Sequence, residues 1–274
     1  MALSLLNNIT SLEAQNQLDQ TDAALQNTLV QLSSGSRLNS GADDPAGLSI
    51  ADSLHAQEAI LNQASNNANE GIGLLQTADG SLGQVTNLLD RAVTIATEAA
   101  NGGLTQSQMK ALDNEFTSIK AEIDRIGGQT TFNSSSVFVA TTTSIFLGST
   151  TNSIGVTIGT LSSSGLSLSS TKLYDGSDTN TADAAAALTA INTAVSTIAQ
   201  DRGTLGATLN RLTDAQNVIT NQVTNLTSAE NLIRSANIPQ DVAQESQLSV
   251  LEQTGVSALS QANQTTQNIL RLFQ

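Results

Sequence analysis

Few side chains in this sequence could carry out chemistry on a substrate. The chain has 274 residues, with a single histidine, His55, and no cysteine. One histidine cannot complete the zinc motif HExxH, and a chain without cysteine has neither thiolate metal ligands nor disulfides. A Ser-His-Asp triad would need a pocket that thin layers of helix do not offer. We therefore interpret His55 as a solvated or packing residue, and we expect no catalytic, metal or cofactor site.

Two adjacent carboxylates, Asp43 and Asp44, are the second candidate for chemistry. Paired aspartates can bind calcium, but the oxygen-bearing residues around this pair lack the spacing of an EF-hand loop. The pair stands directly before Pro45, and carboxylates followed by a proline in the first turn are typical of a helix N-terminus. The pattern therefore predicts that a helix begins here.

The composition favours long helices and excludes several classes of partner. Acidic residues outnumber basic ones by 24 to 10, and the formal net charge is −14. Nucleic acids and anionic membranes attract clustered Lys and Arg, so we expect neither as a partner. Only two prolines interrupt the chain, and aromatic residues make up 2% of it, so aliphatic side chains and alanine must form the core. The N-terminus lacks a signal-peptide pattern, which predicts that any export proceeds without a cleaved signal.

Apolar residues repeat every seven positions in two long stretches. The first stretch has one row at Leu54, Leu61, Ala68, Leu75, Leu82, Leu89 and Ala96, and a partner row at Ala64, Gly71, Ala78, Val85, Ala92 and Ala99. The second stretch has a row at Leu205, Leu212, Ile219, Leu226 and Ile233, while Gln216 and Glu230 interrupt its partner row. A repeat of this kind places an apolar stripe along a supercoiling helix. We predict long helices over 45–100 and 183–233 that pack antiparallel.

Shorter elements complete the expected fold. Residues 3–32 and 242–273 predict terminal helices with thin stripes, and residues 105–126 predict a helix that folds back on the preceding one. Ser, Thr and Gly dominate 129–181, where β-branched runs on both sides of GSTTN predict a hairpin, the alternative being a surface loop. The expected fold is mainly α, with long antiparallel coiled-coil helices forming a rod and a small β-hairpin element in the middle of the chain.

Five stretches of the sequence resemble bacterial flagellin. They are LSSGSRLNSGADDPAGLSIAD at 32–52, NANEGIGLLQTADGSLGQVTNLLDRA at 67–92, EIDRIGGQTTFN at 122–133, NLTSAENLIRSANI at 225–238 and QANQTTQNILRLF at 261–273. The resemblance implies a structural subunit that leaves the cell unfolded through the flagellar type III apparatus and self-assembles into the extracellular filament for motility. The alternatives are a hook–filament junction protein and, less favoured, a secreted coiled-coil adhesin or effector. An enzyme is the least favoured class.

The resemblance also implies a division into domains and a set of assembly residues. Residues 1–44 and 236–274 resemble the inner-tube helices, and residues 45–235 resemble the outer-tube domain, which includes the β-rich region 129–181. Asp43, Asp44 and Pro45 would form the inter-domain hinge, the alternative being a plain helix cap. The self-assembly core would consist of Leu5, Leu12, Leu18, Leu25, Leu32, Leu248, Leu251, Ile269, Leu272 and Phe273.

Partners follow from the same resemblance. The chain would bind many copies of itself, a flagellar export chaperone, and the cap and junction proteins of the filament. Innate immune recognition of flagellins uses a Leu-Gln-Arg followed by an Arg-Glu-Leu, where this chain has Leu-Asp-Arg at 89–91 and Val-Thr-Ile at 93–95. Leu89, Arg91 and Glu115 match the candidate receptor face. Because this chain lacks the arginine and the glutamate of the second triplet, we do not expect strong recognition by the Toll-like receptor. The alternative is that these residues form an ordinary helix surface.

Overall fold

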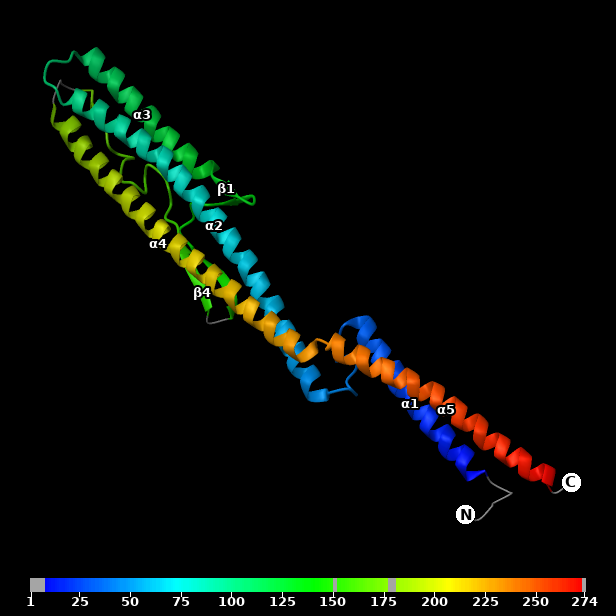
Figure 1. Ribbon diagram of the computed structural model, residues 1–274. Helices are drawn as coiled ribbons and strands as arrows, with labels where there is room; N and C mark the ends of the chain where they lie inside the picture. Colours follow the sequence, from blue (N-terminus) through cyan, green and yellow to red (C-terminus); the bar gives the residue numbers. More distant parts are fainter. Residues whose placement is uncertain (1–7, 150–151, 177–180, 273–274) are drawn as a thin grey trace. The chain divides into compact units, whose positions relative to one another are not determined.

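Helices account for most of the computed structural model, which describes residues 8–149, 152–176 and 181–272, with the side chains of 149 and 266–272 excepted. The helices are α1 (Ile9–Ser34), α2 (Pro45–Ala99), α3 (Gln106–Gln129), α4 (Thr181–Arg234) and α5 (Ile238–Leu272) (Figure 1). Two separate antiparallel hairpins consist of β1 (Thr131–Phe132) with β2 (Ser135–Ser136), and of β3 (Thr142–Ser149) with β4 (Asn152–Thr157). The predicted mainly α fold with a hairpin in the middle of the chain is confirmed.

The chain forms two compact units. The first unit comprises residues up to 58 together with those from 224 onwards, and the second comprises residues 59–223. Helices α2 and α4 therefore contribute to both units. Within the described residues, no helix combines the length and apolarity that crossing a membrane requires.

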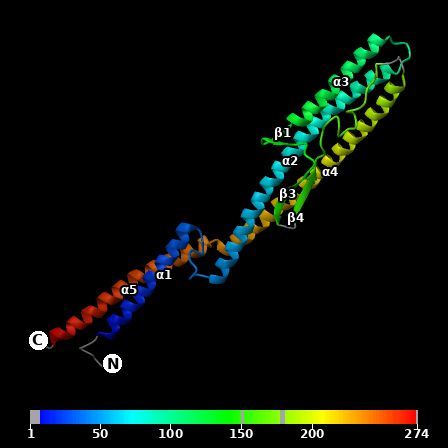
Figure 2. The ribbon, with the colours of Figure 1, turned by 180° about the vertical axis from the view of Figure 1, so that it is seen from behind.

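In the second unit, α3 and α4 lie along α2 (Figures 1 and 2). Arg202 on α4 forms an ion pair with Asp79 on α2 at 2.8 Å. Further along, Gln216 donates a hydrogen bond to Asn69 over the same distance. The residue numbers rise on α4 as they fall on α2, so the two long helices run antiparallel, as the sequence predicted.

Both seven-residue rows of α2 form the core of this unit. From Ala64 to Ala99, every alanine, leucine and valine of the two rows is at most 2% exposed. Leu205, Leu212 and Ile219 of α4 and Phe116 of α3 belong to the same buried cluster. The small members of the partner row let other elements approach the helix closely. A Cβ at Gly71, for example, would collide with the side chain of Ile145. The predicted repeat is confirmed here as a buried stripe.

The Ser-, Thr- and Gly-rich middle of the chain also packs into this core. Ile145 of β3 pairs with Ile154 of β4, and both side chains are buried. The loop after β4 also contributes core residues, namely Ile158, Leu161, Leu166, Leu168 and Leu173. These positions follow no regular period, because the loop winds over the helices instead of presenting one face to them. Periodicity could therefore predict the hairpin but not the burial of this loop.

Charged side chains of α3 hold the same loop by hydrogen bonds to its backbone. The contacts are Asp113 with the N–H of Leu173 (2.8 Å), Lys120 with the carbonyl of Thr171 (2.7 Å), and Asp124 with the N–H and hydroxyl of Ser163 (2.6 and 2.8 Å). Lys120 also lies 4.9 Å from the ring centre of Phe116, and burial lowers the pKa of its ammonium group. Because buried backbone groups need partners, these contacts let an irregular segment cover the helices.

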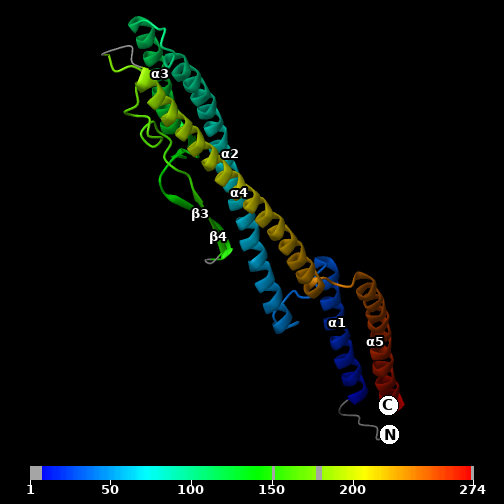
Figure 3. The same cartoon turned by 90° about the vertical axis from the view of Figure 1, so that its left-hand side faces the viewer.

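In the first unit, α1 and α5 lie side by side and run antiparallel (Figure 3). Asn8 donates to the carbonyl of Ala262, and Ser11 donates to Asn263 at 2.9 Å. Helix α5 begins at Ile238, four residues before the predicted start. Residues 235–237 separate α4 from α5, and Pro239 lies just after this break. It occupies the first turn, where a missing N–H costs no helical hydrogen bond.

We predict that two neighbouring glycines of α3 respond oppositely to alanine. A Cβ at Gly127 would collide with the backbone carbonyl of Leu161, whereas a Cβ at Gly128 would meet nothing within 4 Å. Gly127→Ala should lower the free energy of unfolding by about 1–3 kcal/mol through overpacking. Gly128→Ala should raise it by about 0.5–1 kcal/mol, because alanine is the better helix former. Urea unfolding followed by circular dichroism measures both values, and equal effects would contradict the close packing of α3 on the loop.

Candidate functional site

Helix α1 leaves most of its apolar stripe uncovered. Its buried residues are two threonines one heptad apart, Thr21 and Thr28, which are 5% and 3% exposed. Each threonine hydroxyl donates to the carbonyl four residues earlier, which satisfies its hydrogen-bonding need inside the helix. Leu12 is 60% exposed. The other described assembly candidates of α1 are half-buried: Leu18, Leu25 and Leu32.

Helix α5 has two seven-residue rows, one with Leu248, Gly255 and Ala262 and the other with Leu251, Ala258 and Thr265, and it turns the first row toward α1. Leu248 is half-buried, and Gly255 of the same row lies so close to α1 that a Cβ there would be 3.3 Å from Leu18 Cδ1. The other row begins at Leu251, which is 46% exposed, and continues with exposed Ala258. A single neighbouring helix can cover only one seam, so the second row of α5 remains open to solvent in the isolated chain.

The structure does not describe the side chains of four predicted assembly residues. Leu5 and Phe273 lie outside the described residues. Ile269 and Leu272 belong to α5, but their side chains are outside the described part of the structure. Their assignment to a self-assembly core stays a prediction.

Further large apolar side chains of this unit are exposed, beyond those that the sequence singled out. Leu232 is the extreme case at 84%. The others include Ile9, Leu29, Val30, Ile50, Ile238, Val242, Val250 and Val256. Scattered exposed leucines are normal, but a helix pair with this many exposed apolar residues and few buried ones has the character of an interaction surface. Chain periodicity could not identify them, because several lie off the main rows.

The loop before α2 is closed by the first of the paired carboxylates. Asp43 accepts hydrogen bonds from the backbone N–H groups of Asn39 and Ser40, at 3.0 and 2.8 Å. These bonds stabilise the charged carboxylate and so lower the pKa of Asp43. Leu38, just before this loop, is buried.

The second carboxylate, Asp44, caps α2. It accepts from the N–H groups of Ala46 and Gly47, at 3.1 and 2.9 Å, and Pro45 is the first helical residue. A Cβ at Gly47 would collide with this carboxylate, so glycine gives the cap its room. The predicted start of the helix is confirmed, while the role of this segment as a hinge stays a prediction.

The three residues of the candidate receptor face are not all exposed on the surface. Leu89 is fully buried in the core of the second unit. Arg91 and Glu115 are partly exposed and form an ion pair with each other at 2.7 Å. The two charges therefore neutralise one another on the surface, and recognition by a receptor at this face stays a prediction.

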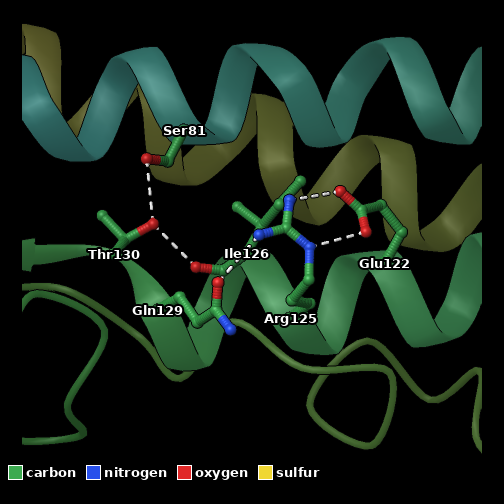
Figure 4. Close-up of polar contacts among 6 residues, drawn as sticks. All are labelled: Ser81, Glu122, Arg125, Ile126, Gln129 and Thr130. Carbon is green, nitrogen blue, oxygen red and sulfur yellow. Dashed lines mark hydrogen bonds and ion pairs between the residues drawn. The ribbon is translucent and has the colours of Figure 1, made fainter.

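The motif at 122–133 joins α3 to α2 (Figure 4). The guanidinium of Arg125 makes a two-pronged ion pair with Glu122, which lowers the pKa of that carboxyl. Thr130, just after the end of α3, is 3.2 Å from the hydroxyl of Ser81 on α2. The motif thus stabilises the C-terminal end of α3 and its contact with α2. This structural role explains why Glu122, Arg125 and Thr130 are present in it.

We predict that the Asp44 cap contributes measurably to stability. Asp44→Ala leaves the first N–H groups of α2 without their acceptor and should cost about 1 kcal/mol. Asp44→Asn should stay close to wild type, because asparagine caps about as well as aspartate. Thermal unfolding of the monomer compares the two. Similar losses in both variants would mean that the charge, and not the cap, matters here.

Comparison with known proteins matches both ends of the chain to one family. Residues 5–143 match the bacterial flagellin N-terminal helical region, and residues 188–273 match the bacterial flagellin C-terminal helical region. The stretch between them, 144–187, contains β4 and the loop held by α3.

Individual relatives align over nearly their full length. The chain is 33% identical to a flagellin of Halalkalibacterium halodurans over 91% of this chain and 92% of the relative. It is 30% identical to the flagellar filament 33 kDa core protein of Treponema phagedenis, over 97% and 98%. A solved structure, the Bacillus cereus flagellin, is similar over 60% of this chain and 94% of that chain, with 32% identity and a TM-score of 0.49. With both terminal regions matched and relatives aligned end to end, the chain belongs to the bacterial flagellin family.

Proposed function

We propose that this protein is the structural subunit of a flagellar filament, and that α1 and α5 complete their packing only when copies assemble. The observation that carries the proposal is the exposed apolar surface of these two helices. Flagellins are structural proteins, which supports a structural role for this chain. A relative named as a filament core protein supports the filament over the junction alternative.

A comparison of the entropic cost of ordering α1 and α5 with the free energy gained by burying their apolar residues favours folding on assembly. Ordering a residue costs roughly 1–2 kcal/mol of backbone entropy. Fully burying a leucine or valine returns about 1.5–3 kcal/mol. The buried residues of α1 are only Thr21 and Thr28, so one partner helix returns little of this. Neighbouring copies that cover the open row of α5, beginning with Leu251, would supply the missing burial.

The two parts of the chain would lie in different layers of the filament. Residues 1–44 and 236–274 would form the inner tube, and residues 45–235 the outer tube, with Asp43, Asp44 and Pro45 as the hinge between them. The filament is extracellular, and we propose that the chain is exported in an unfolded state. An export chaperone and the cap and junction proteins would be its further partners.

We predict that a charge placed on the open row of α5 blocks assembly without unfolding the monomer. Leu251→Asp should abolish seeded polymerisation, because a carboxylate would be buried between copies. Gln253→Asp, two positions away on the same helix and also exposed, adds the same charge and serves as the control. Sedimentation and electron microscopy report filaments, and circular dichroism reports the monomer fold. Normal filaments from Leu251→Asp would exclude this row from the subunit interface.

We also predict different protease sensitivity in monomer and polymer. Limited proteolysis of the monomer should trim both ends and leave a fragment close to residues 45–235, because α1 and α5 are held by one thin seam. The same treatment of the filament should leave the chain intact. Mass spectrometry of the fragments identifies the cut sites, and equal protection of the ends in both states would exclude folding on assembly.

A further inference from the structure

We propose that the first unit contains a divalent metal site of the zinc type, formed by His55, Glu58 and Glu230. Two of these residues stood out in the sequence without a role. His55 is the only histidine, and Glu230 interrupts an apolar row. Helices α2 and α4 bring them together, and one ligand atom from each of the three side chains lies within 4.8 Å of the others.

The geometry is close to that of a bound ion. His55 Nδ1 is 3.6 Å from Glu230 Oε2. Two donors on one tetrahedral zinc ion, each at about 2.1 Å from it, are separated by about 3.4 Å. Glu58 stands three residues after His55 on α2, so both side chains project from the same face of the helix. Small rotamer changes would therefore bring all three donors onto one ion.

The type of donor indicates the type of metal. One imidazole nitrogen with two carboxylate oxygens suits Zn²⁺ and its neighbours in the first transition row, whereas Ca²⁺ and Mg²⁺ prefer oxygen alone. The side chain of His55 is 69% exposed, so the open side of the site can take water as a further ligand. An accessible position of this kind also gives the ion a path of entry.

The charges around the three ligands suit a divalent cation. Glu230 is 12% exposed, and its other carboxylate oxygen, Oε1, faces Arg234 Nε at 3.5 Å. Arg234 is itself held by Asp52 at 2.9 Å. Asp52, Glu58 and Glu230 bring three carboxylates to this region, so a divalent cation would meet several negative charges here. Arg234 contacts the oxygen that the histidine does not face, and it would orient the carboxylate as an outer-shell partner.

An ion here would link α2 to α4 inside the first unit. The same end of α4 is joined to the chain after α1, where Arg37 N–H donates to the carbonyl of Arg234 at 2.8 Å. Metal binding would therefore stabilise the part of the unit in which α2 begins and α4 ends. This effect does not depend on polymerisation, so it can be tested on the monomer alone.

The test is calorimetric titration of the full-length monomer with ZnCl₂. We expect one saturable site in the wild type. Loss of an outer-shell partner weakens metal binding by about 10–100-fold, so loss of a direct ligand in His55→Gln or Glu230→Gln should weaken it at least as much. Glu70→Gln removes the same charge from an exposed position on α2 outside the cluster and should leave the binding constant unchanged.

A second measurement uses the single histidine directly. The ring signals of His55 are the only imidazole signals in an NMR spectrum of this chain, and they should shift as Zn²⁺ saturates the site. The thermal midpoint of the wild type should rise with Zn²⁺, and that of His55→Gln should not. Absence of saturable binding, unshifted ring signals, or unchanged binding in His55→Gln would each overturn the proposal.

Discussion

The burial of two seven-residue rows along α2 is the interaction on which the second unit depends. Between Ala64 and Ala99 these rows are covered from several sides, by α3, by α4 and by the loop after β4. Alanine and glycine in one row make close approach possible, while leucine in the other row supplies most of the apolar area. The loop after β4 belongs to the same buried cluster, so its packing depends in part on these two rows.

The same repeat has a different outcome in the first unit, because the residues on it differ. Threonine occupies the buried positions of α1, and glycine occupies the closest approach of α5. Such a seam brings the two helices together with little apolar burial, and it leaves Leu251 open to solvent. A surface of this kind suits a subunit whose packing is completed by copies of itself.

Several polar residues in this protein fix the ends of elements or hold a loop in place. Asp44 caps α2, Thr130 follows α3 and bonds Ser81, and Asp124 holds the loop by the backbone of Ser163. The cluster of His55, Glu58 and Glu230 differs from ion pairs between helices, such as Arg202 with Asp79, because it brings one imidazole and two carboxylates together, a set of donors that suits a metal ion.

The sequence by itself determined the helices, the antiparallel return of the chain, the hairpin and the start of α2, because heptad spacing, a cap before proline and β-branched runs are local signals. Only the tertiary structure decided that Leu161 and Leu173 are core residues, that Leu89 is buried and unavailable as a surface contact, and that α5 begins at Ile238. It also decided which row of α5 faces α1 and that Glu230 meets His55. These outcomes depend on which helix lies against which face, and spacing along one helix carries no information about its neighbour.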